Sequence, residues 1–287
     1  MIFQGGDLGV GVREIGYLFG QYKLLTQQHE GSLTGKGLNW GGSLLRPEVI
    51  GFGAIYLANE VLHAQGDDIK GKTIAVSGYG NVSIGVALKA KQLGAKVVTI
   101  SGSDGYIYDE NDINTYEKIN IIKELLYSYS YAVEPYAKKF GAIFIKDKTP
   151  WEIPVDIAFP CAFKNELNIE NSANLDRNGV KYVIETSNNE CTSDAVEYFI
   201  KNRIIFLPSK AANIGGIALS GLEMSQNRMK KSWTAEDVDS QLKNIMTNIH
   251  TSCLKEGLEN DGYINYVKGA NIAGFKKVAD VMIDLGY

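Results

Sequence analysis

Apolar positions recur with a helical period over residues 8–28 and 47–64, and the second segment carries proline at an allowed first-turn position. Further along the chain, short apolar runs bounded by glycine, proline or charged residues predict strands. The predicted strands are 71–77, 94–100, 142–145, 155–159, 181–185 and 204–206, and the predicted helices are 84–91, 110–127, 131–140, 215–231, 235–257 and 270–285. Strands that alternate with helices are typical of a parallel sheet covered on both faces.

A glycine-rich turn, SGYGNVS at residues 77–83, links the first predicted strand to the helix that follows it. Gly78 permits a sharp turn, and Gly80 lets a pyrophosphate approach bare backbone. The N–H groups of Val82 and Ser83 at the helix start then face that anion. Ser83 stands where glycine or alanine is usual, and its hydroxyl needs a hydrogen-bond partner. The order of strand, turn, helix and second strand predicts a site for NAD or NADP.

These patterns predict an α/β protein with a doubly wound, mostly parallel Rossmann-like sheet and a helical C-terminal tail. We find no internal repeat and no clear linker in the sequence. The chain is therefore expected to be a single NAD(P)-binding domain over 1–287. In this prediction a dinucleotide-binding core at about 66–214 is flanked by helical segments at 1–65 and 215–287.

The choice between NAD and NADP is expected to be made just past the second strand, at residues 101–105. Asp104 in this turn can accept a hydrogen bond from a ribose 2′-hydroxyl and repel a 2′-phosphate. No Arg or Lys lies within the turn to bind such a phosphate. The sequence therefore favours NAD over NADP, with the alternative that Asp104 and Gly105 only form a turn.

The composition of the chain argues against several classes of protein. The chain has 287 residues, of which 45% are hydrophobic, enough to bury a large core. A net charge of -4 with scattered Lys and Arg residues argues against binding to nucleic acid. There is no secretory signal and no apolar run long enough to span a membrane, so we expect a cytoplasmic protein.

The spacing of the cysteines and histidines does not match that of a metal site. Cys161, Cys191 and Cys253 are too few and too widely spaced for a disulfide framework or a metal knuckle, and Cys161 is expected to be a small buried apolar residue. The three histidines have no neighbours at ligand spacing. We predict that the protein uses no metal.

Several further segments, in order, carry a more specific pattern. They are GGDLGVGVREIGY at 5–17, LTGK at 33–36, GGSLLRPE at 41–48, PSKAANIGG at 208–216, SGLEMSQN at 220–227 and GANIAGF at 269–275. Together they resemble the hexameric, bacterial-type glutamate dehydrogenases of the Glu/Leu/Phe/Val dehydrogenase family. The resemblance runs from about residue 5 to the C-terminus.

The resemblance implies the reversible oxidative deamination of L-glutamate to 2-oxoglutarate and ammonia. Asp7 matches the family aspartate that exchanges protons with the amino group and the attacking ammonia or water, a role suited to a carboxylate in a closed cleft. Ser220 matches the serine that contacts the side-chain carboxylate of the substrate, and Asn213 an asparagine between nicotinamide and substrate. Asn81 and Asn188 match asparagines on the cofactor side.

The resemblance also implies that part of the cleft is missing. In the family, a substantial N-terminal domain precedes the equivalent of Asp7 and supplies the lysines that bind the substrate carboxylates. Each lost contact is worth roughly 1.5 to 3 kcal/mol. We therefore expect this chain, as a truncated family member, to lack useful activity alone and to act on a small-molecule substrate only if a partner completes the cleft. The hexamer contacts of the family lie largely in that domain, so the oligomeric state stays open.

Several positions depart from the family pattern. Ile50 replaces a threonine that hydrogen-bonds the nicotinamide carboxamide, Phe163 and Lys164 replace a Thr-Gln pair, and the loop at 185–192 has lost its proline. These changes favour an alternative, a catalytically inactive relative that serves as a nucleotide-binding or assembly module. Leucine, phenylalanine or valine as substrate is a further alternative, which the serine at 220 disfavours.

Overall fold

The computed structural model describes the chain except for residues 1–4, 7–9, 29–30, 32 and 129–131. Its centre is a five-stranded sheet in which every neighbouring pair is parallel, with the strand order β2-β1-β6-β7-β8. The strands are β1 (Thr73–Val76), β2 (Lys96–Val97), β6 (Ile157–Phe159), β7 (Tyr182–Ile184) and β8 (Ile205–Leu207). This confirms the predicted α/β fold with a parallel sheet.

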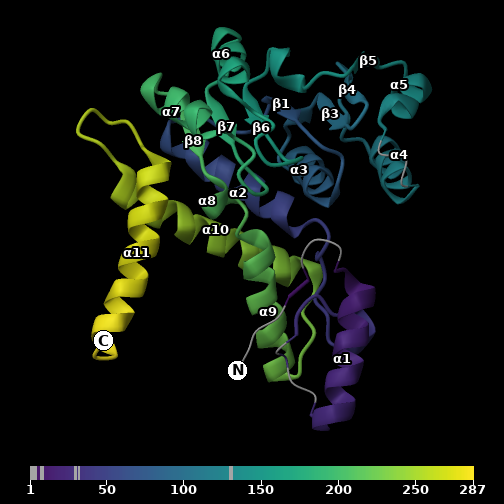
Figure 1. Cartoon of the computed structure of the whole chain (residues 1–287), viewed down its shortest axis with the longest axis vertical. Helices are drawn as coiled ribbons and strands as arrows, with labels where there is room; N and C mark the ends of the chain where they lie inside the picture. The colour runs from purple at the N-terminus through teal and green to yellow at the C-terminus, as the bar shows by residue number, and fades with distance from the viewer. Residues whose placement is uncertain (1–4, 7–9, 29–30, 32, 129–131) are drawn as a thin grey trace.

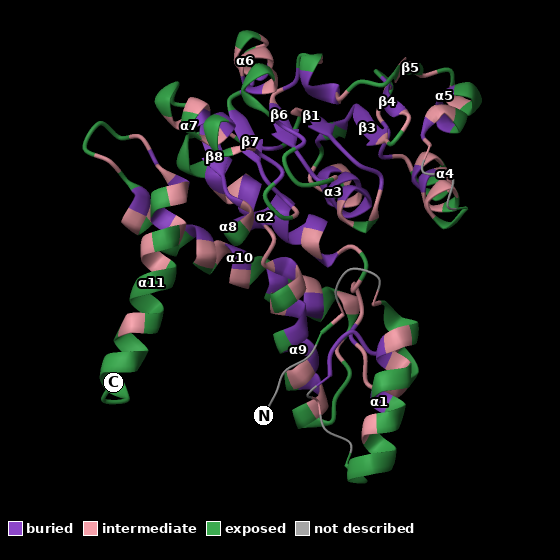
Figure 2. Cartoon of the chain, viewed as in Figure 1, coloured by how far each residue is buried: buried purple, intermediate pink, exposed green. Residues whose placement is uncertain are grey.

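Both faces of this sheet are covered, as the near-continuous apolar strands predict. Alternate residues of β1 enter different clusters: Ile74 joins a core with α2 (Val49–Ala64) and α3 (Asn81–Gln92), whereas Ala75 joins one with α6 (Ile169–Arg177) and α7 (Ser193–Lys201). Figure 1 shows these helix pairs on opposite sides of the strands. In Figure 2 the strands of this sheet and helix α2 are coloured largely as buried, whereas α6 and α7 show intermediate and exposed residues toward solvent.

A second, three-stranded sheet corrects the expectation of one strand over 94–100. The chain leaves the parallel sheet after β2 and forms an antiparallel sheet of β3 (Thr99–Gly102), β4 (Gly105–Tyr108) and β5 (Ile143–Lys146). At this point Thr99 Oγ1 accepts from Val76 N at 2.9 Å and donates to Val76 O at 3.0 Å. A hydroxyl therefore occupies the place of a backbone partner on β1 where β3 leaves the parallel sheet.

Helices α2, α3 and α9 (Gly215–Met229) lie in close backbone contact below the sheet. A Cβ at Gly51 of α2 would lie 2.3 Å from Val86 N in α3, and one at Gly215 would lie 2.4 Å from Val49 O. Such distances are shorter than any real contact, so only glycine permits this approach. The glycines thus fix the start of α3 relative to α9, which carries Ser220.

The remaining helices pack around this centre. They are α1 (Val12–Thr26), α4 (Tyr116–Tyr127), α5 (Glu134–Phe140), α8 (Ser209–Ala212), α10 (Ala235–Gly257), α11 (Tyr266–Asp284) and the short 3-10 turns η1 (Leu38–Trp40) and η2 (Pro150–Glu152). Of these, α8 and α10 contribute buried residues to the main core. A capping box begins α10, in which the Thr234 side chain accepts from Asp237 N at 3.1 Å. Figure 1 shows α1 and α9 at the same end of the molecule and α11 at its C-terminal edge.

The described residues bear on the environment of the cysteines, on metal binding and on membrane spans. Cys161, Cys191 and Cys253 are all free and buried, as expected for Cys161, and among the described residues no cluster of three His, Cys, Asp or Glu side chains is arranged to hold a metal ion. Within the same part of the chain, no helix has both the length and the apolar character needed to cross a bilayer.

Candidate functional site

The glycine turn between β1 and α3 has the conformation that the sequence predicts. Gly78 has φ +72°, in the left-handed region, and a Cβ there would lie 3.0 Å from Ser83 Oγ and 3.2 Å from Ala162 Cα. Its N–H donates to Ser101 Oγ at 2.7 Å. Glycine is therefore required at Gly78 by both conformation and space.

The N-terminus of α3 is open. Gly80 is its N-cap, and apart from Gly80 and its two neighbours in the chain, no described residue has an atom within 4 Å of a Cβ built there. Ser83 Oγ donates to Ser77 O at 2.9 Å, which supplies the partner that this hydroxyl needs. The first N–H groups of a helix lack partners within the helix and carry the positive end of its dipole. This end of α3 can therefore receive a phosphate group.

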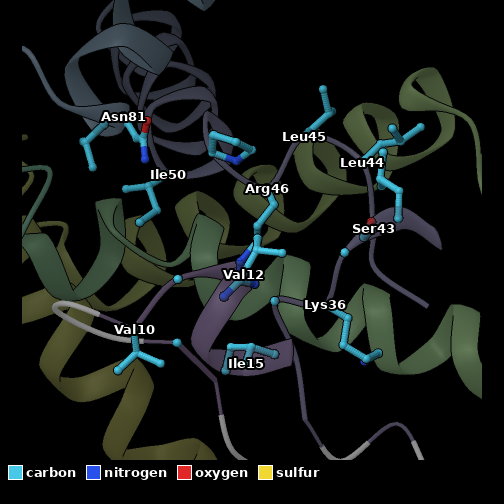
Figure 3. Close-up of a pocket in the computed structure, with 17 residues that line it drawn as sticks. Val10, Val12, Ile15, Lys36, Ser43, Leu44, Leu45, Arg46, Ile50 and Asn81 are labelled. Atoms are coloured by element: carbon cyan, nitrogen blue, oxygen red, sulfur yellow. The ribbon is translucent and has the colours of Figure 1, made fainter. Parts of the chain in front are cut away.

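A cleft of about 840 Å³ joins this helix start to the N-terminal segments of the chain. Asn81 and Val82 of α3 line it together with Ile50 of α2. Figure 3 shows Asn81 and Ile50 toward one end of the cleft and Lys36 toward the other, with Arg46 between them. One cavity therefore connects the predicted cofactor side with charged residues that follow α1.

Arg46 is a site residue that the sequence reasoning did not single out, although it lies in the quoted GGSLLRPE segment. Its Nη1 donates to Ser220 Oγ at 2.9 Å, and Thr34 Oγ1 donates to the same oxygen at 3.0 Å. Among the described residues, Arg46 forms no salt bridge with a carboxylate. Burial lowers the pKa of this guanidinium, and the charge of Glu223 opposes that shift. A partly desolvated cation with unused donors is suited to an anionic ligand.

A buried ion pair holds the loop next to Arg46. Lys36 Nζ lies 2.7 Å from Glu223 Oε1, and both side chains are almost completely buried. Lys36 Nζ also donates to Leu33 O, while Gly35 N donates to Glu223 Oε2 at 3.1 Å. A buried pair is stable only when further hydrogen bonds satisfy both ions, and these bonds do so. The pair therefore fixes the loop around Gly35 against α9.

The two asparagines expected near the cofactor meet each other. Asn213 Nδ2, just after α8, donates to Asn188 Oδ1 at 3.1 Å and to Ser187 O at 2.8 Å. Both lie where β7 and β8 end, which is the edge of a parallel sheet at which ligands bind. Neither residue lines the cleft of about 840 Å³. Their role in cofactor binding stays a prediction.

Asp104 is placed differently from its expected role. It lies in the turn between β3 and β4, and its carboxylate accepts hydrogen bonds from Val133 N at 3.0 Å and Glu134 N at 3.1 Å. These bonds satisfy the first N–H groups of α5. The structure thus gives Asp104 a helix-capping contact, and a contact with a ribose would have to use its remaining acceptor capacity.

The predicted catalytic residue, Asp7, lies outside the described residues. Gly6 and Val10, on either side of residues 7–9, both line the cleft. The flanking chain is therefore at the cavity, together with Arg46 and Asn81.

Comparisons with known proteins agree with this architecture. A sequence model of the glutamate/leucine/phenylalanine/valine dehydrogenase family matches residues 41–286. A protein of Bacteroides fragilis called NAD-specific glutamate dehydrogenase is 57% identical over 282 residues, which is 98% of this chain and 63% of that protein. One of Haemophilus influenzae called NADP-specific glutamate dehydrogenase is 49% identical with the same coverage.

Solved structures give the same result. A glutamate dehydrogenase structure superposes with a TM-score of 0.95 at 46% identity and covers 99% of this chain and 64% of its own. The glutamate dehydrogenase of Plasmodium falciparum has a TM-score of 0.94 at 42% identity, with 61% of its chain covered. The chain thus spans a little under two thirds of the length of its relatives. It belongs to the glutamate/leucine/phenylalanine/valine dehydrogenase family.

Proposed function

We propose that the chain is the cofactor-binding part of a glutamate dehydrogenase, which converts L-glutamate to 2-oxoglutarate and ammonia with a nicotinamide cofactor. The observation that carries this proposal is the cleft from the open N-terminus of α3 to Arg46, whose guanidinium donates to the buried Ser220 Oγ behind it. One end offers unpaired helix N–H groups for a phosphate, and the other offers donors for a carboxylate. Both are required for a reaction between a dinucleotide and a dicarboxylic acid.

In this proposal the residues on the cofactor side are Gly78, Gly80, Asn81, Val82, Ser83 and Asn188. When bound, the nicotinamide ring supplies the chemistry of hydride transfer. NAD is proposed over NADP because the turn at 101–105 contains no Lys or Arg for a 2′-phosphate. The Bacteroides fragilis relative is named for NAD and the Haemophilus influenzae relative for NADP, so the relatives' names support either cofactor.

On the substrate side, Arg46 and Ser220 hold the side-chain carboxylate. Ser220 Oγ accepts from Arg46 and Thr34, so its own proton is free to be donated to the substrate. Asn213 lies between substrate and nicotinamide, and Asp7 exchanges the proton at the amino group. The chemistry needs water to be excluded, which an open cleft does not achieve.

We further propose that the rest of the cleft comes from polypeptide that corresponds to the part of the relatives not matched by this chain. The chain covers 63% of the Bacteroides fragilis relative. Without the lysines that the resemblance places there, two substrate carboxylates lose charge-assisted contacts. The chain alone is therefore proposed to bind cofactor without useful turnover.

One observation favours a second function, a nucleotide-binding or assembly module without catalysis. Ile50 lines the cleft beside Asn81 and Val82, and its side chain can neither donate nor accept a hydrogen bond. An enzyme that orients a nicotinamide carboxamide has no use for an apolar residue at that point.

Calorimetric titration of the chain with NAD, NADH and NADPH tests the cofactor assignment. Binding of NADH establishes the cofactor site, whereas a folded chain that binds none of the three would overturn the dehydrogenase and the nucleotide-binding module and leave an assembly role. A fusion of the N-terminal part of the Bacteroides fragilis relative to this chain separates the two. Glutamate-dependent NADH formation by the fusion supports the dehydrogenase, whereas cofactor binding without turnover supports the module.

A further inference from the structure

Two loops at the carboxyl edge of the parallel sheet are joined side by side. The β6 loop (residues 160–168) and the β7 loop (residues 185–192) share a parallel backbone ladder, in which Leu167 N donates to Glu190 O at 3.0 Å and Thr192 N donates to Leu167 O at 3.0 Å. Ser187 Oγ closes the other end by donating to Cys161 O at 3.1 Å. The β7 loop also carries Asn188, so its position affects the predicted cofactor side.

Acidic side chains are buried between these loops. Glu190 is fully buried, and neither of its carboxyl oxygens has a hydrogen-bond partner within the described chain. Glu166 Oε2 is also buried without a partner there, whereas its Oε1 accepts from Ser77 Oγ at 2.6 Å and from Ala162 N at 3.0 Å. An ionised carboxylate cannot be buried at reasonable cost without donors, so it takes up a proton instead.

The charges of neighbouring carboxylates also favour protonation of the buried Glu190. The pKa of Glu190 is raised to about 8, chiefly by burial and also by the charges of Glu185 and Glu166, while nearby backbone amides that fall short of hydrogen-bonding geometry oppose the shift. Burial raises the pKa of Glu166 to about 7, against the hydrogen bond from Ser77. Glu185 differs, because it accepts from Cys191 N and from Ser209 N.

We propose that Glu190 and Glu166 form a proton-dependent latch, in which a bound proton keeps the β7 loop closed on the β6 loop and its loss opens the β7 loop. A protonated carboxyl at this site buries little charge, whereas the ionised form places an unpaired anion beside two other glutamates. Opening the β7 loop exposes Glu190 to water and removes that penalty. The closed state therefore binds the proton more tightly than the open state, and rising pH favours opening. This inference does not depend on the proposed function.

The rates at which two buried cysteines react with a thiol reagent can report whether the β7 loop is open. Cys191 is buried next to Glu190 in the β7 loop, and Cys253 is buried in α10. Burial raises the pKa of both thiols above the usual range, so each reacts with a thiol reagent only after its surroundings open. Two exposed thiols are then deprotonated to the same extent at a given pH, and this dependence cancels when their rates are divided. The ratio of the two labelling rates, resolved by peptide mapping, therefore reports loop opening alone.

The first test is the wild-type chain between pH 7 and pH 9. We expect the labelling rate of Cys191 relative to Cys253 to rise about tenfold, because closed and open loops then differ in bound protons. Carboxyl carbon NMR of the ¹³C-glutamate-labelled chain should show a group that titrates near pH 8. A labelling ratio that stays constant between pH 7 and pH 9 contradicts the opening of the β7 loop. If every glutamate carboxyl titrates below about pH 6, no buried carboxyl holds a proton at neutral pH and the proposal is wrong.

Glu190→Gln keeps the shape of the side chain without its ionisation, and Glu170→Gln at an exposed position of α6 is the matched control. Glu190→Gln should remove the highest carboxyl titration and flatten the labelling ratio, whereas Glu170→Gln should change neither. Equal effects of the two variants contradict the assignment to Glu190. Because the wild-type measurements need no variant, they decide the proposal even if Glu190→Gln fails to fold.

Discussion

Arg46 Nη1 donates to Ser220 Oγ over 2.9 Å, and this bond connects the segment before α2 to the middle of α9. Since Ser220 Oγ also accepts from Thr34, its hydroxyl proton and the remaining guanidinium donors are both available to a ligand. Two such donors side by side match the two oxygens of a carboxylate. The bond therefore supports the proposed carboxylate site, which joins segments that the sequence alone shows only as separate motifs.

Replacing Arg46 with methionine tests this site. In the fusion described above, we expect the KM for 2-oxoglutarate to rise about 10-fold to 100-fold, since a hydrogen bond to a charged group is worth roughly 1.5 to 3 kcal/mol. Thr34→Val is the control, because it removes a bond to Ser220 and leaves the cation in place. Steady-state kinetics at saturating cofactor provide the measurement. An unchanged KM in a folded Arg46→Met fusion places the carboxylate elsewhere.

Gly80→Asp tests the open start of α3. Gly80 has φ −76° and open space around its Cα, so aspartate fits there without strain and is a good N-cap. The carboxylate occupies the anion site and repels a pyrophosphate, so NADH binding should fall at least about 100-fold, or roughly 3 kcal/mol. Gly80→Asn adds the same bulk without charge and should bind more tightly than Gly80→Asp. Calorimetry measures both, and equal affinities for the two variants argue against a phosphate at this helix.

Ile50→Thr tests the nicotinamide end of the cleft. The new hydroxyl can hydrogen-bond the carboxamide, and a net hydrogen bond is worth about 1 kcal/mol, so NADH should bind about fivefold more tightly. Ile50→Val is the control, because it shortens the side chain to the same shape without a hydroxyl. If Ile50→Val gives the same gain, space rather than hydrogen bonding limits the binding of the ring.

Much of the fold is readable from the sequence because local patterns and tertiary packing agree. The helix at Ala235–Gly257 begins and ends at the predicted residues, since its capping box and its apolar period point to the same element. The helices α6 and α7, only nine residues each, were missed, as was β4. Short elements carry too few periods to be distinguished from loops.

Less of the site could be predicted from the sequence, because its geometry depends on contacts between segments that are far apart in the chain. Ser220 and Arg46 are 174 positions apart, and nothing local to Arg46 indicates that a serine of α9 accepts its hydrogen bond. The conformation of Gly78 was predictable, because a turn after a buried strand needs a positive φ. The capping contact of Asp104 with Val133 was not, since the two lie in separate elements brought together by the second sheet.

The buried pair between Lys36 and Glu223 is expected to be essential for stability. Glu223→Gln leaves the ammonium of Lys36 buried without its counter-ion, and breaking such a pair costs about 3 to 5 kcal/mol. Glu152→Gln removes an exposed partner of Lys148 and should cost less than about 0.5 kcal/mol. Denaturant unfolding followed by circular dichroism compares the two variants. Equal midpoints contradict a stabilising role for the buried pair.

His250 should make the stability of the C-terminal helices depend on pH. It lies in α10, and its Nε2 is 3.0 Å from the hydroxyl of Tyr266 in α11. Burial lowers the pKa of this imidazole, and the charge of Glu60 opposes the shift, so the folded chain holds His250 neutral where the unfolded chain already binds a proton. Its contribution to stability is thus complete above the unfolded pKa of about 6.5 and is lost as pH falls from there toward the lowered pKa.

His250→Gln removes this titration and keeps a polar group near Tyr266. The Tm of the wild-type chain should fall more steeply than that of His250→Gln as the pH is lowered from 7 to 5. Thermal unfolding across this pH range measures both curves. Parallel curves for wild type and His250→Gln mean that the folded chain protonates His250 as readily as the unfolded chain does, which contradicts the burial argument.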